Sequence, residues 1–302
     1  MSGIFSADCA GERLDVFLVR KMPDLSRSYA QRLIEEKRVT VDGTPRKANY
    51  KLRGGECVAC DLPPVEEVSV RAENIPLDIL YEDADIIVIN KPRGMVVHPA
   101  AGISGGTLVN ALLYHCQDLS GINGALRPGI VHRLDKDTSG VMAAAKNDAA
   151  HRSLAEQIQK KEARREYRAI VYGNIAERAG IITGDIGRHP TDRKRMAIVR
   201  ENGKHATTHF EVLERFSGYT FVACRLETGR THQIRVHMTS IGHPLVGDAK
   251  YTSKKNPFAI AGQALHSLTL TLAHPRSGEE MAFTAPLPAD IEEILCALRS
   301  GR

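Results

Sequence analysis

Nine residues in the middle of the chain constrain its structure and function more than any other segment. The run His132–Gly140 (HRLDKDTSG) holds two carboxylates on either side of a lysine, preceded by a histidine and an arginine. Apolar residues flank it at Gly129–Val131 and Val141–Ala145, so the pattern predicts a strand, a charged loop and a second strand. The alternative is a solvated hairpin turn, but solubility alone requires no such dense set of chemically active side chains. We therefore interpret the run as a functional loop held by a rigid scaffold.

The positive charge of the chain is concentrated near its N-terminus. The formal net charge is +5 and the pI is about 8.9, which alone identifies no partner. In residues 27–53 the basic side chains exceed the acidic ones by a surplus equal to the net charge of the whole chain. An ordinary solvated helix is the alternative, but a concentrated basic face favours a polyanion such as a nucleic acid. The residues that we expect to contact it are Arg27, Arg32, Lys37 and Arg38.

The composition argues against a membrane or secreted protein. No apolar run approaches the roughly 20 residues needed to span a bilayer. The first residues, Met1–Ser6, lack a basic region followed by an apolar stretch, so no signal peptide is expected. The six cysteines are scattered, which suits a reducing compartment better than a disulfide framework. We therefore expect a cytoplasmic protein.

Two domains joined by a linker are expected. Residues 1–66 form a small N-terminal domain, residues 67–74 a linker and residues 75–302 the main domain. The linker follows a segment in which prolines stiffen the chain and like charges extend it. In the main domain, strands and helices are mixed without regular βαβ alternation, which predicts an α+β fold.

Two local elements bear on function. In the small domain, Ser26 or Ser28 is expected to cap a helix that runs to about Lys37 and is followed by a strand and tight turn at Val39–Gly43. In the main domain, a helix is expected at Thr231–Ile241, since a glycine follows it and a proline comes shortly afterwards.

Several motifs occur in an order that resembles the RluA-type pseudouridine synthases, and most closely the subgroup of ribosomal large-subunit pseudouridine synthases D. Besides His132–Gly140, these motifs are Asn90–Pro99 (NKPRGMVVHP), Arg165–Ala169 (REYRA), Thr228–His237 (TGRTHQIRVH) and His243–Asp248 (HPLVGD). The basic N-terminal segment resembles the S4 RNA-binding domain. One departure from the family pattern is Tyr251-Thr252-Ser253, where Tyr-Gly-Gly is expected; this affects a loop conformation rather than the chemistry.

The resemblance implies a fold and a reaction. The main domain is expected to be a large mixed, mostly antiparallel sheet with a central cleft, preceded by a small α/β S4-like domain. Pseudouridine formation breaks the bond between ribose C1′ and uracil N1, after which the base rotates and rejoins the ribose through C5. The substrate carries its own leaving group and electrophile, so we expect no metal, no nucleotide cofactor and no redox cofactor.

Three catalytic residues follow from the resemblance. Asp135 matches the family aspartate, which acts on the ribose either by attacking C1′ or by removing the C2′ proton; the sequence does not separate the two routes. Arg235 matches the arginine that pairs with this aspartate, and a nearby cation stabilises a carboxylate. Tyr167 matches the tyrosine that stacks on uracil and assists proton removal at C5. A tyrosine in a half-buried strand is the ordinary alternative.

Further residues are expected to bind RNA. A target uridine must be flipped out of its stack to reach the cleft, and Arg133 is placed to fill the vacated space. Arg230 is expected to bind a phosphate or shape its loop. His232 lies three residues before Arg235, so on the expected helix both share a face near the N-terminus, which favours anions.

The resemblance also suggests a substrate and a state of assembly. The subgroup implies uridines in 23S ribosomal RNA, in particular the helix 69 cluster, either in free RNA or in an assembling large subunit. A monomer is expected. Two other functions stay open on the residues alone: an RNA glycosylase or nucleoside hydrolase that uses Asp135, and a non-catalytic RNA-binding assembly factor.

Overall fold

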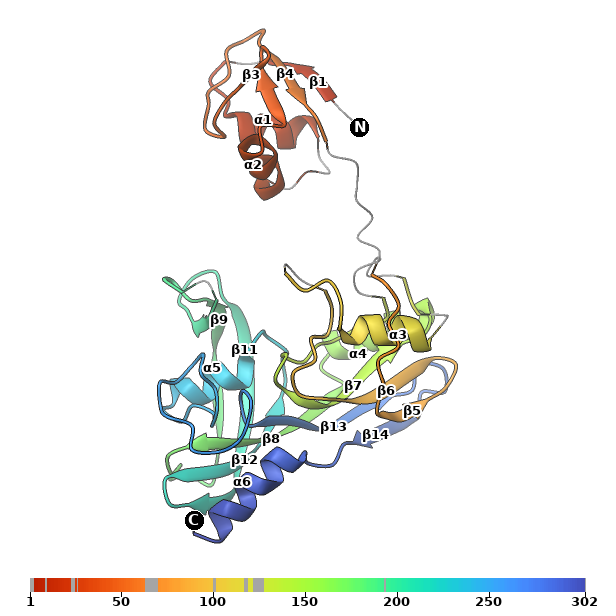
Figure 1. Ribbon diagram of the computed structural model, residues 1–302, viewed down its shortest axis with the longest axis vertical. Helices are drawn as coiled ribbons and strands as arrows, with labels where there is room; N and C mark the ends of the chain where they lie inside the picture. The colour runs from red at the N-terminus through yellow and green to blue at the C-terminus, as the bar shows by residue number, and fades with distance from the viewer. Residues whose placement is uncertain are drawn as a thin grey trace. The chain divides into compact units, whose positions relative to one another are not determined.

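The computed structural model describes residues 3–8, 10–22, 25, 27–62, 70–99, 102–116, 119–121, 128–192 and 194–301. The chain divides into two compact units, Met1–Val68 and Ser69–Arg302 (Figure 1). Each unit has a hydrophobic core of its own. The expected helix cap Ser26, the side chain of Ser28 and residues 67–69 of the expected linker lie outside the described residues.

The first unit contains a four-stranded antiparallel sheet in the order β1-β4-β2-β3. Its strands are β1 (Gly3–Ser6), β2 (Val39–Val41), β3 (Thr44–Pro45) and β4 (Cys57–Cys60). Between β2 and β3, Asp42 and Gly43 both have left-handed backbones with φ of 48° and 75°, as expected for a two-residue hairpin turn. The tight turn predicted after Val41 is therefore present.

Two helices, α1 (Leu14–Lys21) and α2 (Arg27–Glu35), complete this unit. The apolar stripe of α2, formed by Ala30, Leu33 and Ile34, is buried together with strand residues of the sheet. Removing this stripe from water stabilises the helix on the sheet. The charged residues of α2 are thereby left on the opposite, solvated side.

The second unit is built on one large sheet. Its strands follow the order β10-β9-β11-β12-β8-β13-β7-β6-β5, and β14 pairs with β13. Every pairing is antiparallel except that of β7 with β13. The strands are β5 (Ile79–Glu82), β6 (Ile86–Lys91), β7 (Ser139–Ala145), β8 (Arg164–Tyr172), β9 (Ala179–Arg188), β10 (Met196–Ile198), β11 (Lys204–Phe216), β12 (Tyr219–Leu226), β13 (Leu265–Ala273) and β14 (Glu280–Thr284). The prediction of a mixed, mostly antiparallel sheet is confirmed.

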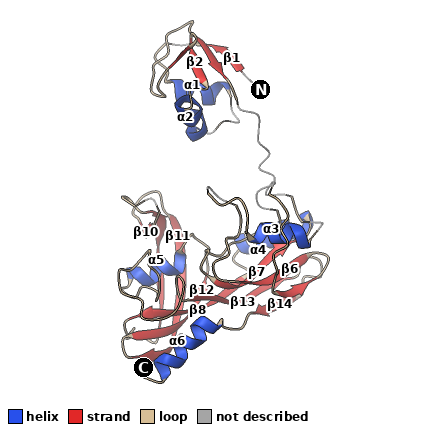
Figure 2. Ribbon diagram, in the orientation of Figure 1, coloured by secondary structure: helices blue, strands red, loops and turns tan. Residues whose placement is uncertain are grey.

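Helices accompany this sheet in the described part of the second unit (Figure 2). They are α3 (Leu108–His115), α4 (Asp148–Gln159), α5 (Gln233–Ser240) and α6 (Ala289–Arg299). α4 packs Ala150 and Leu154 into the core beside β7, while α6 packs Ile291, Ile294 and Leu295 against β8 and β12. Within the described residues, no helix combines the length and apolarity that crossing a bilayer requires.

The strand expected just before the charged loop is absent. Ile130 forms an isolated antiparallel bridge with Ala144 in place of a strand, because Gly129, with φ of 70°, turns the chain there. The strand expected after the loop is β7, which is buried along its whole length between β6 and β13. At Gly140 a Cβ would lie 2.1 Å from the Ser267 carbonyl oxygen. Only glycine therefore allows β13 to lie this close to the start of β7, where the charged loop joins the sheet.

Candidate active site

The charged loop is held in place by the end of β6. Lys91 is completely buried, and its ammonium group donates to the carbonyl oxygens of Pro92 (2.8 Å), Met95 (2.9 Å) and Lys136 (3.1 Å). The backbone N–H of Thr138 donates to the Asp135 carbonyl oxygen at 3.1 Å and closes a turn. These bonds satisfy the buried donors and fix the backbone around Asp135.

His132 has a structural contact at the start of the loop. Its Nε2 accepts a hydrogen bond of 3.0 Å from the backbone N–H of Ala143. Burial, with a smaller effect from Arg165, lowers the pKa of His132 to about 3. The imidazole is therefore neutral at neutral pH, which is the form that accepts this hydrogen bond.

Asp135 and Arg235, 100 residues apart in the sequence, form an ion pair. Nη1 of Arg235 donates to Oδ2 of Asp135 at 2.9 Å, while Nε and Nη2 donate to the two carboxylate oxygens of Asp248 at 2.6 and 2.8 Å. Burial alone would lower the pKa of Arg235, but Asp248 and Asp135 together raise it above its usual value. The guanidinium thus stays charged between two carboxylates, and Asp135 is the more exposed of them.

His232 lies outside the helix on which we expected it. α5 begins at Gln233, and His232 precedes it with a left-handed φ of 57°. Its Nδ1 is 2.7 Å from the hydroxyl oxygen of Tyr251, which already accepts the Met196 N–H at 2.9 Å. The other ring nitrogen, Nε2, lies 3.9 Å from Asp135 Oδ2. Burial lowers the pKa of His232 to about 4.

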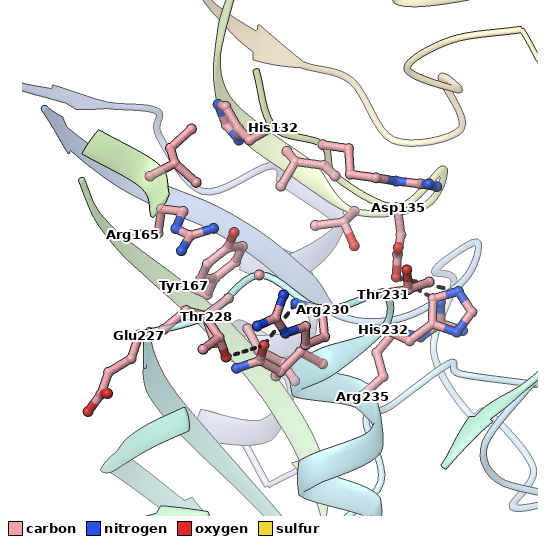
Figure 3. A pocket seen from close by; sticks show the side chains of 18 of the residues that line it. His132, Asp135, Arg165, Tyr167, Glu227, Thr228, Arg230, Thr231, His232 and Arg235 are labelled. Atoms are coloured by element: carbon pink, nitrogen blue, oxygen red, sulfur yellow. Dashed lines mark hydrogen bonds and ion pairs between the residues drawn. The ribbon is translucent and has the colours of Figure 1, made fainter. Parts of the chain in front are cut away.

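A cavity of about 780 Å³ opens above these residues. Asp135, Tyr167, His232 and Arg235 all line it, and Figure 3 shows Tyr167 across the cavity from Asp135 and His232. Tyr167 is buried in β8, and this burial raises the pKa of its hydroxyl. The volume is within the range of small-molecule sites and is sufficient for a nucleotide. The structure thus brings the three predicted catalytic residues together.

The two arginines predicted to contact RNA also line this cavity. Arg133 and Arg230 are both exposed. Arg230 Nε donates to the His205 carbonyl oxygen at 3.0 Å, and its backbone N–H donates to the Gln233 side chain at 2.9 Å. Both arginines therefore present positive charge to solvent at the mouth of the cavity.

Of the four basic residues predicted to contact RNA from the first unit, Arg27, Arg32 and Lys37 are exposed and Arg38 is half-buried. Three of the four form ion pairs. Arg27 bonds to the fully buried Asp15 at 3.1 Å. Arg32 lies 3.6 Å from Glu36 and stacks on the Tyr29 ring. Arg38 is within 3.3 Å of Asp61, whereas Lys37, with φ of 59°, has no ion pair among the described residues.

Sequence reasoning missed several residues that shape the site. We assigned no role to Asp248, Tyr251 or Lys91, although each lies in or near a quoted motif. Arg165, at the start of β8, belongs to a basic cluster whose sequence favours contact with RNA phosphates over a solvated helix end, but it lines the cavity and is only 6% exposed. Such burial of a charged side chain depends on segments that are distant in the sequence, so the local pattern carried no signal for it.

Two groups of possible metal ligands occur away from this cavity. They are Glu82, His115 and Cys116, and Asp83, Asp85 and His274. In each group the carboxylates already bind protein cations: Lys146 donates to Glu82 at 2.8 Å, and Arg276 to Asp85 at 2.7 Å. These contacts explain both groups as ion-pair networks.

The fold and the site together define a class of protein. A carboxylate held by a guanidinium lies in a nucleotide-sized cavity, exposed arginines surround its mouth, and a small basic unit precedes it. This combination is typical of an enzyme that acts on a nucleic acid.

Comparison with known proteins gives the family. The model for RNA pseudouridylate synthases matches residues 85–240, and the model for the S4 domain matches residues 12–58. The RNA pseudouridine synthase YlyB of Bacillus subtilis strain 168 is 52% identical over 98% of this chain and 97% of its own length. A ribosomal large subunit pseudouridine synthase D of Neisseria meningitidis serogroup A is 46% identical over 97% of this chain and 80% of its own.

A solved structure supports the same family assignment. Human RNA pseudouridylate synthase domain containing 1 superposes with a TM-score of 0.57 and 26% identity, over 79% of this chain and 98% of that one. The chain therefore belongs to the RNA pseudouridylate synthase family, and it is an isomerase with an N-terminal S4 domain. The resemblance to synthase D seen in the motifs is confirmed.

Proposed function

We propose that this enzyme converts uridines of large-subunit ribosomal RNA to pseudouridine, with the helix 69 cluster of 23S RNA as its target. The relatives named synthase D support the choice of RNA. The observation that carries the proposed site is the 2.9 Å ion pair between Asp135 and Arg235 in the cavity that Tyr167 also lines. We further propose that the protein acts as a monomer in the cytoplasm, during assembly of the large subunit.

In the proposed mechanism, the target uridine leaves its stack and enters the cavity, and Arg133 fills the vacated space. Asp135 then acts on the ribose, by attack at C1′ or by removal of the C2′ proton. Arg235, fixed by Asp248, pairs with this carboxylate and orients it. Tyr167 stacks on the uracil, and its hydroxyl assists removal of the proton at C5 after the base has turned.

The two units are proposed to have separate roles, one in RNA binding and the other in catalysis. Residues 1–66 bind RNA through Arg27, Arg32, Lys37 and Arg38, residues 67–74 connect the domains, and residues 75–302 perform the isomerisation. Arg230 and His232 contact the RNA near the scissile bond. Phosphate contacts of this kind give affinity and register, while the cavity selects the base.

The test is pseudouridine formation by wild type and Asp135→Asn on 23S RNA and on assembling subunits from cells that lack the enzyme. Wild type should modify helix 69, whereas the variant should bind RNA with similar affinity and form no pseudouridine. The variant keeps the size of the side chain, so thermal unfolding should be nearly unchanged. Activity of the variant would refute the role of Asp135, and release of free uracil by wild type would indicate a glycosylase.

A further inference from the structure

Arg165 is a charged side chain whose environment the proposed mechanism does not explain. It projects from β8 into the cavity and is only 6% exposed. Its Nε is buried without a hydrogen-bond partner, and no ion pair of its guanidinium occurs among the described residues. Buried donors nearly always have partners, and burying an unpaired charge is costly. An isolated guanidinium in a cavity is therefore a candidate for binding something that enters the cavity.

The two carboxylates of the cavity do not neutralise Arg165. Asp135 bonds to Arg235 at 2.9 Å. The oxygens of Glu227 are 3.2 Å from the Lys161 ammonium and 2.7 Å from His209 Nε2. The positive charge of Arg165 is thus left for a ligand that carries or develops negative charge.

The negative charge has two candidate sources, an RNA phosphate and the uracil base. The depth of Arg165 in the cavity distinguishes them. RNA phosphates are strongly hydrated and run along the surface, where the exposed Arg133 and Arg230 can meet them. Arg165 instead lies beside the buried ring of Tyr167, across the cavity from Asp135 (Figure 3). A base that stacks on Tyr167 while its ribose faces Asp135 would lie within the part of the cavity that Arg165 lines.

We propose that Arg165 stabilises the negative charge that develops on uracil when the glycosidic bond breaks. This inference rests on the proposed role of Asp135, and it holds for both routes. The electron pair of the C1′–N1 bond moves to N1 and is delocalised onto O2 and O4, while Asp135 either bonds to C1′ or takes the C2′ proton. When C5 joins C1′, the Asp135–C1′ bond breaks or, in the other route, Asp135 returns the proton to C2′. The C5 proton is then lost and N1 gains one, which neutralises the base. Arg165 binds this anion more strongly than neutral uridine, which is the requirement for catalysis.

The backbone at Gly229 provides the space for this guanidinium. A Cβ at position 229 would lie 2.6 Å from Arg165 Nη1. The backbone of Gly229 is not in the left-handed region, so alanine is compatible with the local conformation. Gly229→Ala therefore displaces the guanidinium without removing its charge and provides a second, independent variant.

The experiment compares single-turnover consumption of uridine and of 5-fluorouridine at the target position, with RNA affinity measured over a range of salt concentrations. Fluorine stabilises the uracil anion, so the 5-fluoro substrate depends less on Arg165. Arg165→Gln should slow consumption of uridine about 100-fold, as does loss of one oxyanion-hole donor. It should slow consumption of 5-fluorouridine much less, and Gly229→Ala should show the same pattern. Arg164→Gln, which removes an exposed arginine paired with Glu280, is the matched control and should behave as wild type.

Three outcomes would overturn the inference. If Arg165 binds a phosphate, its loss lowers the affinity and reduces the slope of log K against log salt by about one. If its role is only structural, both substrates slow equally and thermal unfolding shifts. An unchanged rate for uridine would exclude any role in bond breaking. Failure of the proposed function itself would show differently, as absence of pseudouridine with wild type or activity in Asp135→Asn.

Discussion

Asp248 holds Arg235 through two hydrogen bonds, from Nε at 2.6 Å and from Nη2 at 2.8 Å. This bidentate contact fixes the guanidinium plane and directs Nη1 toward Asp135. The side chain of Asp248 is 1% exposed and that of Asp135 is 16% exposed. The buried Asp248 carboxylate therefore stabilises the charge of Arg235, and the more accessible Asp135 carboxylate is available for chemistry.

Asp248→Asn should therefore impair both stability and catalysis. Breaking a buried ion pair leaves one charge uncompensated, so the free energy of unfolding should fall by on the order of 3 kcal/mol. The rate of pseudouridine formation should fall while RNA affinity changes little, because Arg235 loses its orientation. Urea unfolding and single-turnover assays measure the two effects. Glu214→Gln breaks the exposed pair with Arg299 and should cost no more than about 1 kcal/mol; equal effects of the two variants would contradict this account.

Arg230→Gln should weaken RNA binding in a salt-dependent way. If Arg230 neutralises one phosphate, its loss should reduce the slope of log K against log salt by about one. Filter binding at several salt concentrations would measure the slope. The control is Arg299→Gln on α6, an exposed arginine that does not line the cavity. An unchanged slope for Arg230→Gln would mean that this arginine only shapes its loop through the bond to the His205 carbonyl oxygen.

Arg27 and Lys37 should behave differently despite their shared charge. Arg27 bonds to Asp15, which is completely buried and is also held by Arg13 and Gln31. Arg27→Gln should therefore lower the free energy of unfolding of the S4 domain, by about 1–2 kcal/mol. Lys37→Gln should lower RNA affinity without changing stability, since Lys37 has no ion pair among the described residues. Thermal unfolding would distinguish them, and equal losses of stability would disprove the prediction.

Acid should destabilise the catalytic domain through His132. The pKa of His132 is about 3 in the fold, against about 6.5 in an unfolded chain. As the pH falls below 6.5, the unfolded state binds a proton that the folded state excludes, so the free energy of unfolding decreases until about pH 3. The loss from this residue is at most about 5 kcal/mol, reached near pH 3.

The measurement is urea unfolding between pH 7.5 and 4. His132→Gln offers an amide oxygen to the Ala143 N–H and does not titrate, so its stability should vary less with pH than that of wild type. The remaining variation comes in part from His232 and His237, whose pKa values burial lowers to about 4. His205→Gln, at an exposed position, should keep the wild-type dependence. Identical pH dependence of wild type and His132→Gln would show that another group controls acid unfolding.

Local patterns in the sequence predicted the elements whose structure is decided by nearby residues. The hairpin at Val41–Thr44 follows from two residues that accept left-handed backbones, and α2 follows from its apolar stripe. The strand predicted just before the charged loop does not form. An apolar triplet in the sequence does not show whether a neighbouring strand has an unpaired edge with which it can form a ladder. β7 pairs with β6 from Gly140 to Ala145 and with β13 at Ser139 and Gly140, and Ile130 meets it in an isolated bridge at Ala144.

The sequence by itself determined the family, the charged loop and the identity of the candidate catalytic residues, because motif residues and their spacing persist in the linear chain. Only the tertiary structure decided that Asp248 supports Arg235, that His232 precedes its helix, and that Arg165 is buried without a counter-charge. The physical reason is that burial and ion pairing are properties of three-dimensional neighbours. They arise when segments as far apart as Asp135 and Arg235 converge on one cavity.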